Sequence, residues 1–506
     1  MFRRPLLVAA LAAFLAAPAL STWSIVVVNR ATGEVAIACA TCVEGINLAT
    51  AVPVIRVGRG AAAAQSYLDD TQRNRRAIYA GLDGGVDPFV ILQNLSLSDP
   101  GHETRQYGIV DLDGRAVTFT GTQAGAFAAG LTGVDGDLVY AIQGNVLTGL
   151  PVLTAAEQAL RATPGDLAAK LMAAMQAARA MGGDGRCSCP SSTPFGCGAP
   201  PPSFTHSSYV AHIIIARIGD QVRPCGSIGC AMGQYFAKLE ANWGLPTDPD
   251  AVVRLQGLYD TWRQNLIGRT DQVRSVAFAE RTVLPADRFS RTRIRLRLND
   301  WQGTPVTNAA ATFTVRHAAG SAGIGQPSAV TSIGNGEWAF DVQATERAGT
   351  DLYEIVVQDG GRAVQLHPPA ELRFEAVPAL QVDRASISAA QGEGVLLRLD
   401  GGLARAQREY VMLLGLSGTA PGTLVAPGIN VPLNFDDATA VGIELLNTPF
   451  FVSSWGRLQS DGRSLAALQP LPGTFTDILG YELSFAWVML QPIDFASNAV
   501  SVRIAP

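Results

Sequence analysis

The sequence predicts a layered α+β domain followed by all-β modules, in a chain of 506 residues with 48% hydrophobic content. In the first half, alternating apolar strands are interleaved with pairs of helical segments, which is typical of layered α+β folds. From about Ala277 the sequence changes to short strands separated by Gly, Pro and Asn turns, which is typical of all-β modules. The chain length suggests about three domains.

The N-terminus has the pattern of a secretory signal peptide. Arg3 and Arg4 precede a short apolar stretch, Leu6 to Leu15, and small residues follow. We therefore predict a signal peptide over residues 1–21 and an exported protein, either periplasmic or extracellular. No later apolar run is long enough to predict a membrane span.

Two cleavage sites fit the signal. Cleavage after Ala19 would release Leu20, whereas cleavage after Ser21 would release Thr22. In the second case the mature chain begins with a threonine that carries both a hydroxyl nucleophile and an α-amine, which titrates near pH 8 and can act as its base. The alternative interpretation is that Thr22 is merely the first residue of a strand.

Composition excludes several classes of function. The net charge of −5 gives no basic surface for nucleic acid. Lys170 and Lys238 are the only lysines, so a lysine beside Thr22, as in a Thr-Lys-Asp arrangement, is not expected. Arg30 or Arg56 could supply the positive charge of such a lysine, but an arginine could not act as a base. The five histidines are scattered and no metal or phosphate motif occurs, so we predict neither a metal nor a cofactor.

Seven cysteines occur, and in an exported chain they are disulfide candidates: Cys39, Cys42, Cys187, Cys189, Cys197, Cys225 and Cys230. Cys39 and Cys42 form a C-x-x-C pair, for which a structural disulfide is favoured over a redox pair or half of a zinc site. Because seven is odd, at least one thiol stays free or pairs between chains.

The strands of the first half follow from alternating apolar residues and turn sequences. A hairpin loop at 29–33 joins the first two strands, and Asp113-Gly114 forms a turn between two later ones. The predicted strands are Thr22–Asn29, Glu34–Ala40, Val52–Val57, Gln106–Asp111, Arg115–Thr120, Leu138–Gln143 and Tyr209–Ile218.

Helices are predicted where capping residues precede helix-forming sequence. Asp87 and Pro88 begin one of them, and others are rich in Ala and Leu. The predicted helices are Thr71–Leu82, Asp87–Leu97, Pro151–Arg161 and Pro164–Met181. A further helix, Thr247–Arg269, is expected to be capped by Thr247 or Asp248. Its apolar stripe should dock onto the first domain or onto a partner, and comprises Val252, Leu255, Leu258, Tyr259, Trp262 and Leu266.

The β-rich half has two features open to alternative interpretations. Four arginines alternate with apolar residues between Arg291 and Arg297, which favours a solvated strand face over a surface for an anionic polymer. The last section carries four aromatic residues that we interpret as core rather than as a carbohydrate groove: Trp455, Phe475, Phe485 and Trp487.

Several motifs of the first half occur in the order seen in one bacterial and archaeal family. They are Thr22-Trp23-Ser24-Ile25-Val26, Thr32-Gly33-Glu34, Arg105-Gln106, Asp111, Thr120-Gly121, Gln143-Gly144-Asn145 and Gly182-Gly183-Asp184. The chain thereby resembles the domain of unknown function 1028 family, which is similar to N-terminal nucleophile hydrolases. The resemblance implies an αββα sandwich, in which two sheets lie between helical layers.

The resemblance covers residues 22–269 and includes the cysteine-rich insertion of exported members. Residues 277–376 look like a bacterial immunoglobulin-like β-sandwich. Residues 380–506 resemble β-rich modules of exported bacterial proteins. The predicted organisation is thus a signal peptide, 1–21, a hydrolase-like domain, 22–269, and two β modules, 277–376 and 380–506.

The resemblance implies an amide hydrolase in which Thr22 is the nucleophile. Asn145 could donate to the oxyanion, with Gly144 allowing close approach, or could satisfy its own turn. Arg105 could bind a substrate carboxylate or lower the amine pKa, or form a structural ion pair. Asp184 could orient the amino terminus or cap a turn.

Two functional hypotheses follow. The first is an exported hydrolase that acts on a small amide or peptide-like bond. The second is a non-enzymatic envelope or extracellular binding protein, whose β modules bind a glycan or another protein and whose first domain is a scaffold. The sequence makes no prediction about oligomeric state.

Overall fold

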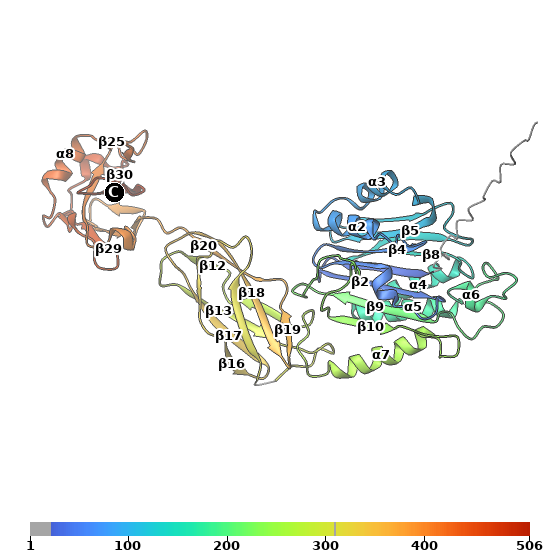
Figure 1. Cartoon of the computed structure of the whole chain (residues 1–506). Coiled ribbons are helices and arrows are strands. Elements are labelled where there is room, and N and C mark those ends of the chain that lie inside the picture. The colour runs from blue at the N-terminus through green and yellow to red at the C-terminus, as the bar shows by residue number, and fades with distance from the viewer. Residues whose placement is uncertain (1–21, 308–309) are drawn as a thin grey trace, which may run out of the picture.

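The computed structural model describes residues 22–307 and 310–506, and the predicted signal peptide lies outside this part of the chain. Three groups of elements follow one another in a row (Figure 1). The elements of the N-terminal group lie within residues 22–265, those of the middle group within 276–375 and those of the C-terminal group within 380–505. The C-terminus lies in the group farthest from the N-terminal one. No helix among the described residues is long and apolar enough to cross a bilayer.

The N-terminal group contains two antiparallel sheets. The first has the strand order β10-β9-β2-β1-β8-β7, and the second has the order β3-β4-β5-β6. The strands of the first sheet are β1 (Trp23–Asn29), β2 (Glu34–Thr41), β7 (Ala129–Asp135), β8 (Leu138–Gly144), β9 (Val210–Ala216) and β10 (Ala237–Ala241). Those of the second are β3 (Pro53–Arg56), β4 (Gly60–Ser66), β5 (Arg105–Asp111) and β6 (Ala116–Thr120).

The inner faces of the two sheets pack against each other. Val26, Ile37 and Ile214 of the first sheet share one buried cluster with Ala61 and Val110 of the second. Because side chains alternate along a strand, the other residues of each strand face outward, where helices cover them. Burying both faces explains why β1 and β2 are almost continuously apolar.

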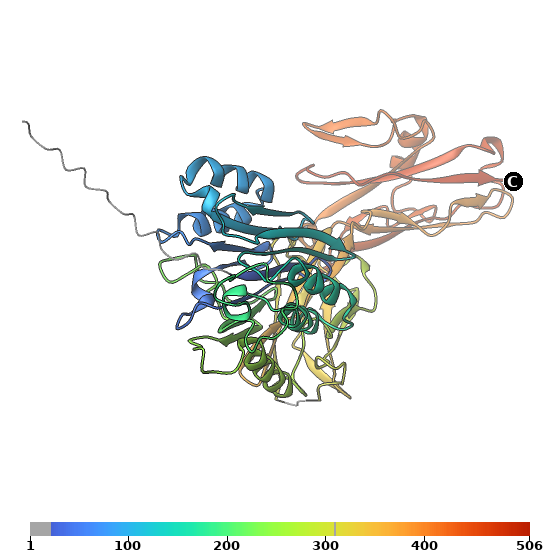
Figure 2. The same cartoon turned by 90° about the vertical axis from the view of Figure 1, so that its right-hand side faces the viewer.

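Helices cover the outer faces of both sheets (Figure 2). On the second sheet, α2 and α3 bury Ile78 and Leu95, and on the first sheet α4, α5 and α7 enclose the largest core. The helices are α1 (Leu48–Ala51), α2 (Arg73–Asp83), α3 (Pro88–Ser98), α4 (Pro151–Ala162), α5 (Leu167–Ala180), α6 (Gly185–Ser188) and α7 (Ala251–Asn265). A mixed arrangement of helices and many strands is thereby confirmed.

Helix α7 begins later than predicted. Asp250 caps it by accepting from the backbone N–H of Val252 and Val253, while Asp248 accepts from Leu245 in the preceding turn. The predicted caps Thr247 and Asp248 are therefore wrong, because the chain still turns at both. The helix docks through most of the predicted stripe, but Leu258 is exposed.

The middle group is a sandwich of two sheets around one core, which includes Leu296, Phe340 and Phe374. One sheet contains β11 (Val276–Ala279), β13 (Arg291–Arg297), β15 (Gln326–Pro327), β16 (Thr331–Gly334) and β17 (Glu337–Gln343). The other contains β12 (Val283–Pro285), β14 (Thr312–His317), β18 (Gly349–Asp359), β19 (Arg362–Gln365) and β20 (Ala370–Glu375).

The arginines of β13 lie on an outer face and pair with acidic neighbours. Arg293 binds Asp341 at 2.9 Å, and Arg297 binds Glu337 at 2.9 Å. Carboxylates of the same module thus pair with these arginines across the strands, which agrees with a solvated strand face.

The C-terminal group also encloses its own core between two sheets. One sheet contains β21 (Leu380–Val382), β23 (Val395–Asp400), β27 (Phe451–Val452) and β29 (Arg463–Leu468). The other contains β22 (Ser386–Ser388), β24 (Glu409–Gly415), β28 (Trp455–Arg457), β30 (Glu482–Met489) and β31 (Val500–Ala505). A hairpin of β25 (Thr423–Ala426) and β26 (Ile429–Val431) and helix α8 (Asp437–Glu444) complete it.

Three of the four aromatic residues predicted for this core contribute to it. Phe485 and Trp487 are fully buried, and Phe475 packs at the margin of the same core. Trp455 is 51% exposed, so its core assignment is wrong. It lies on β28, an edge strand that pairs only with β24 within its sheet.

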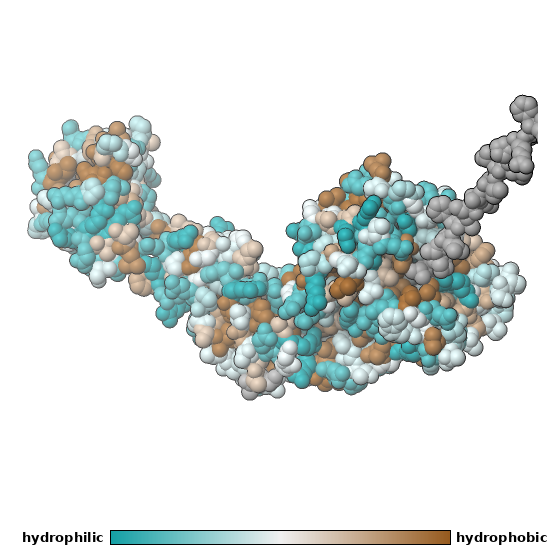
Figure 3. Space-filling model, viewed as in Figure 1, coloured by the Kyte–Doolittle hydropathy of each residue, from teal (hydrophilic) through white to brown (hydrophobic). Residues whose placement is uncertain are grey.

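Apolar side chains also reach the surface in small groups (Figure 3). The outer side of α3 exposes Phe89, Val90 and Leu97. Such scattered exposure is ordinary for a folded protein.

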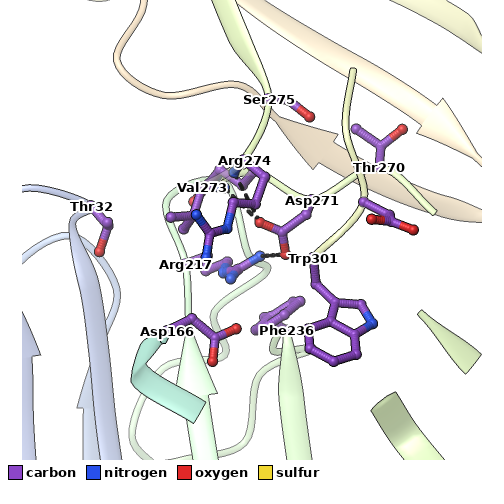
Figure 4. A network of polar contacts seen from close by, with 12 residues as sticks. Thr32, Asp166, Arg217, Phe236, Thr270, Asp271, Val273, Arg274, Ser275 and Trp301 are labelled. Carbon is purple, nitrogen blue, oxygen red and sulfur yellow. Dashed lines mark hydrogen bonds and ion pairs between the residues drawn. The ribbon is translucent and has the colours of Figure 1, made fainter. Parts of the chain in front are cut away.

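A buried ionic cluster joins the N-terminal group to the middle group (Figure 4). Arg217 donates to Glu34 Oε1 and to Asp271 Oδ2, each at 2.8 Å, and its guanidinium lies 3.3 Å from the centre of the Phe236 ring. Glu34 begins β2 and Arg217 follows β9. The middle group therefore contacts the sheet at the end opposite to Thr22.

We predict that Arg217→Leu lowers the free energy of unfolding by about 3–5 kcal/mol, because two buried carboxylates lose their cation. Arg297→Leu, which breaks an exposed pair, should cost less than about 1 kcal/mol. Chemical denaturation followed by tryptophan fluorescence measures both. Equal, small losses in the two variants would contradict a structural role for the cluster.

Candidate active site

Thr22 lies at the start of β1, between the ends of its two neighbouring strands. Its carbonyl accepts from Asn145 N at 3.1 Å and from Gln65 Nε2 at 2.8 Å. Trp23 pairs with Ala40 of β2 and with Gly144 of β8, so the next residue of each neighbour flanks Thr22. The backbone at Thr22 is thereby fixed from both sheets.

The side chain of Asn145 holds the nitrogen of Thr22. Its Oδ1 accepts from Thr22 N at 3.1 Å, while its Nδ2 donates to Ala124 O at 2.8 Å and to Ser66 Oγ at 3.2 Å. Asn145 is fully buried. An oxyanion donor would use Nδ2, but here Nδ2 donates to Ala124 and Ser66 and thereby fixes the orientation of the amide. The geometry therefore favours a role for Asn145 in positioning the Thr22 nitrogen over the predicted role as an oxyanion donor.

Three non-glycine residues around Asn145 have left-handed backbone conformations. Ser66 has φ 69°, Phe127 has φ 35° and Val146 has φ 55°. A positive φ is strongly disfavoured for a β-branched residue such as valine. Such strain costs about 1–3 kcal/mol for each residue and clusters at functional sites. The backbone strain thus converges on the residue that binds Thr22 N.

A row of buried polar side chains extends inward from Thr22 between the sheets. Ser24 Oγ donates to Gln65 Oε1 at 2.7 Å and accepts from Gln143 Nε2. Gln65 Nε2 also donates to Gln106 Oε1 at 2.8 Å. The sequence analysis did not single out these residues as a network, although each is a polar residue at an inward position of an apolar strand.

The row needs a glycine opposite it. A Cβ on Gly108 would lie 2.0 Å from Gln143 Oε1, so only glycine leaves room for this amide. The polar row therefore fits between the closely packed sheets only because residue 108 has no side chain.

Cys39 and His212 continue the row away from Thr22. Cys39 lies opposite both Ser24 and His212 in the sheet. Burial raises the pKa of the Cys39 thiol well above its usual value, so it is protonated and a poor nucleophile. Burial, with a smaller contribution from Lys238, lowers the pKa of His212 to about 3, so the imidazole is neutral near pH 7.

Asp184 is the centre of a second cluster of polar groups, which lies at the end of β2. Its carboxylate accepts from Cys42 N at 2.7 Å and pairs with Arg186 Nη2 at 2.8 Å. It also caps α6 by accepting from Arg186 N at 3.0 Å. The same Nη2 donates to Thr41 Oγ1 at 3.2 Å. Of the two alternatives for Asp184, the structure shows the cap, and its contacts bring in Thr41 and Arg186, which the sequence analysis missed.

The disulfides differ from the C-x-x-C interpretation. Cys42 pairs with Cys187, and the other bonds are Cys189–Cys197 and Cys225–Cys230. Cys39 is a buried free cysteine. The prediction of a Cys39–Cys42 bond is wrong because Cys39 points between the sheets from inside β2, whereas Cys42 follows the strand and turns toward α6.

Arg105 is separated from this site by strand alternation. Gln106 points between the sheets, so Arg105 points to the helical side, where it pairs with Asp99 at 2.9 Å and donates to Tyr67 O at 2.7 Å. The structure therefore shows the ion-pair alternative. The substrate-binding prediction for Arg105 finds no support in this geometry.

The two arginines considered as substitutes for a lysine, and the two lysines themselves, make their contacts away from Thr22. Arg56 pairs with Asp83 and Arg30 contacts Gly136 O, both near the other end of the sheets. Lys170 donates to Thr163 O on the helical side, and Lys238 pairs with Glu240. Within residues 22–307 and 310–506, no cluster of three or more His, Cys, Asp or Glu side chains could hold a metal ion.

The N-terminal part of the chain matches a known family. Residues 22–193 match the model described as "Family of unknown function (DUF1028)". The predicted DUF1028 resemblance is confirmed over that range. No curated protein matches the chain.

Three solved structures illustrate what the chain is similar to. A DUF1028 protein of Silicibacter pomeroyi is 21% identical, with a TM-score of 0.35, over 48% of this chain and 88% of that one. The Yersinia pseudotuberculosis adhesin InvE is 15% identical, with a TM-score of 0.21, over 47% of this chain and 60% of that one. The Escherichia coli adhesin FdeC is 10% identical, with a TM-score of 0.21, over 97% of this chain and all of that one. These TM-scores are low and carry no functional argument.

We predict that Gly108→Ala lowers the free energy of unfolding by about 1–3 kcal/mol, because its methyl group would collide with the Gln143 amide. Gly257→Ala is the matched control, since nothing lies within 4 Å of a Cβ at this position of α7. Alanine there should be neutral or stabilise by up to about 1 kcal/mol. Chemical denaturation compares the two variants, and equal stabilities would contradict the close packing around the polar row.

Proposed function

We propose that residues 22–269 form an N-terminal nucleophile hydrolase domain that cleaves a small amide or peptide-like bond. Thr22 is the nucleophile, and it becomes the first residue when residues 1–21 are removed during export. The observation that carries this proposal is the hydrogen bond from Thr22 N to Asn145 Oδ1, within a strained and buried cluster.

Two further observations support the proposed domain class. The helices α2 and α3 and the helices α4, α5 and α7 lie outside two sheets that pack face to face, which is the αββα order of such hydrolases. Thr22 lies at the start of a central strand, where a new amino terminus would remain attached to the sheet. The three disulfides fit an exported protein in an oxidising compartment.

The chemistry follows from one residue and its neighbour. The neutral α-amine of Thr22 donates one hydrogen to Asn145 Oδ1, which leaves its lone pair to take the proton of Oγ1. Oγ1 attacks the amide carbon, the C–N bond breaks, and the ammonium returns the proton to the leaving nitrogen. Water then attacks the ester, giving up one proton to the amine, which passes it to Oγ1 as the carboxylic acid leaves.

In this mechanism Asn145 is a positioning residue rather than a base. Ser66 and Ala124 fix its amide so that Oδ1, not Nδ2, faces Thr22 N. The neighbouring Gln65 holds the Thr22 carbonyl, which prevents rotation of the residue. Such fixed geometry reduces the entropy lost on reaching the transition state.

The β modules, 277–376 and 380–506, have a separate role in this proposal. Each encloses a core of its own, and the first is attached through Arg217 at the sheet end opposite to Thr22. They therefore serve as a spacer and as the region that binds a glycan or protein partner, and do not line the Thr22 site. The immunoglobulin-like class of residues 277–376 is part of the same proposal.

A β-lactone probe, which esterifies a nucleophilic hydroxyl, tests the proposal on the exported protein. We expect mass spectrometry to locate the adduct on Thr22, with labelling retained in Thr22→Ser and reduced at least about 100-fold in Thr22→Ala. Thr261→Ala removes an exposed threonine of α7 and should label like the wild type.

Undiminished labelling of Thr22→Ala would place the nucleophile elsewhere. If the wild-type protein is not labelled at all, the hydrolase proposal fails and the non-enzymatic binding hypothesis replaces it.

A further inference from the structure

Arg186 lies beside the strand end that carries Thr22. In the antiparallel register of β1 and β2, Trp23 is opposite Ala40, so the next pair along the ladder is Thr22 with Thr41. Arg186 Nη2 donates to Thr41 Oγ1 at 3.2 Å. Since directly opposed residues lie about 5 Å apart, a molecule bound at Thr22 comes within reach of this guanidinium.

The position of Arg186 is fixed by polar and covalent contacts. Asp184, which is fully buried, accepts from Arg186 Nε at 3.2 Å and from Nη2 at 2.8 Å. The next residue, Cys187, forms a disulfide with Cys42, which directly follows Thr41. This bond ties the turn that carries Arg186 to the end of β2. A preorganised guanidinium loses little entropy when it binds an anion.

Compensation of the buried Asp184 charge is one reason for an arginine at this position. The Asp184 carboxylate, however, also accepts from the backbone N–H groups of Cys42 and Arg186. Arg186 extends further, to Thr41, and its side chain remains 28% exposed. These two features are not needed for charge compensation, and the contact with Thr41 places the guanidinium at the Thr22 end of the sheet.

Two partly exposed aromatic side chains lie on neighbouring loops. Phe127 is 38% exposed and Phe195 is 41% exposed. Gly196 N donates to Leu147 O, and a Cβ on Gly196 would contact the Phe127 ring at 3.9 Å. The disulfide Cys189–Cys197 closes the short loop that carries Phe195.

We propose that Arg186 binds a carboxylate of the substrate, so that Thr22 acts on amides that carry a carboxylate near the scissile bond. The inference rests on the proposed hydrolase function. Arginine suits this role because its planar fork matches a carboxylate and stays charged at all working pH values.

Two β-lactone probes that differ in one group test the inference on the exported protein. One carries a carboxylate next to the lactone, and the other carries the neutral methyl amide at that position. We expect the carboxylate probe to label Thr22 about tenfold faster or more. Arg186→Gln should lower the ratio of the two labelling rates to about one. Because the ratio is taken within one variant, a general change in its labelling rate does not affect the result.

Two further variants sharpen the comparison. Arg186→Lys keeps the charge and should keep part of the preference, whereas Arg30→Gln removes an arginine at the opposite end of the sheet and should keep all of it. Equal rates for the two probes in the wild type, or a preference that survives in Arg186→Gln, would overturn the role of Arg186 alone. Failure of both probes to label Thr22 would instead overturn the hydrolase proposal.

Discussion

The pairing of β1 between β2 and β8 is the constraint on which the site depends. Both pairings are antiparallel and extend over seven residues, from Trp23 to Asn29. They fix the position of the Thr22 backbone. Because the strand stays paired on both sides, a chain cut before Thr22 would keep its new amino terminus in place.

The two sides of Thr22 are held by different kinds of interaction. On the β8 side, strained backbone at Ser66 and Val146 surrounds a single amide, that of Asn145. On the β2 side, the Cys42–Cys187 disulfide and the buried Asp184 carboxylate hold Arg186. The first β module contacts the far end of the sheet, away from both sides of the site.

Most of the fold could be predicted from the sequence where periodicity is strong. The strands at 23–29, 34–41 and 210–216 and the helices α2 to α5 lie close to their predicted bounds. The sequence analysis missed β4, β7 and β10, because Gly60–Ser66 is mainly alanine and the other two mix Gly, Lys and Glu into short strands. Their strand conformation depends on sheet neighbours rather than on intrinsic propensity.

The site was predictable only in part. The cleavage pattern and the motif order pointed to Thr22, Asn145 and Asp184, which lie at one end of the first sheet. The orientation of the Asn145 amide, the contact between Arg186 and Thr41, and the pairing of Cys42 with Cys187 all join residues more than 100 positions apart. Such contacts are set by tertiary packing, so patterns in the local sequence do not predict them.

The mature amino terminus is the measurement that tests the central claim most directly. Intact mass and N-terminal sequencing of the exported protein should show a chain that begins at Thr22, with an unmodified α-amine beside Asn145. A stable mature chain that begins at Leu20 would leave the Thr22 nitrogen in a peptide bond. That result would contradict the account, because the nucleophile would have no amine to accept its proton.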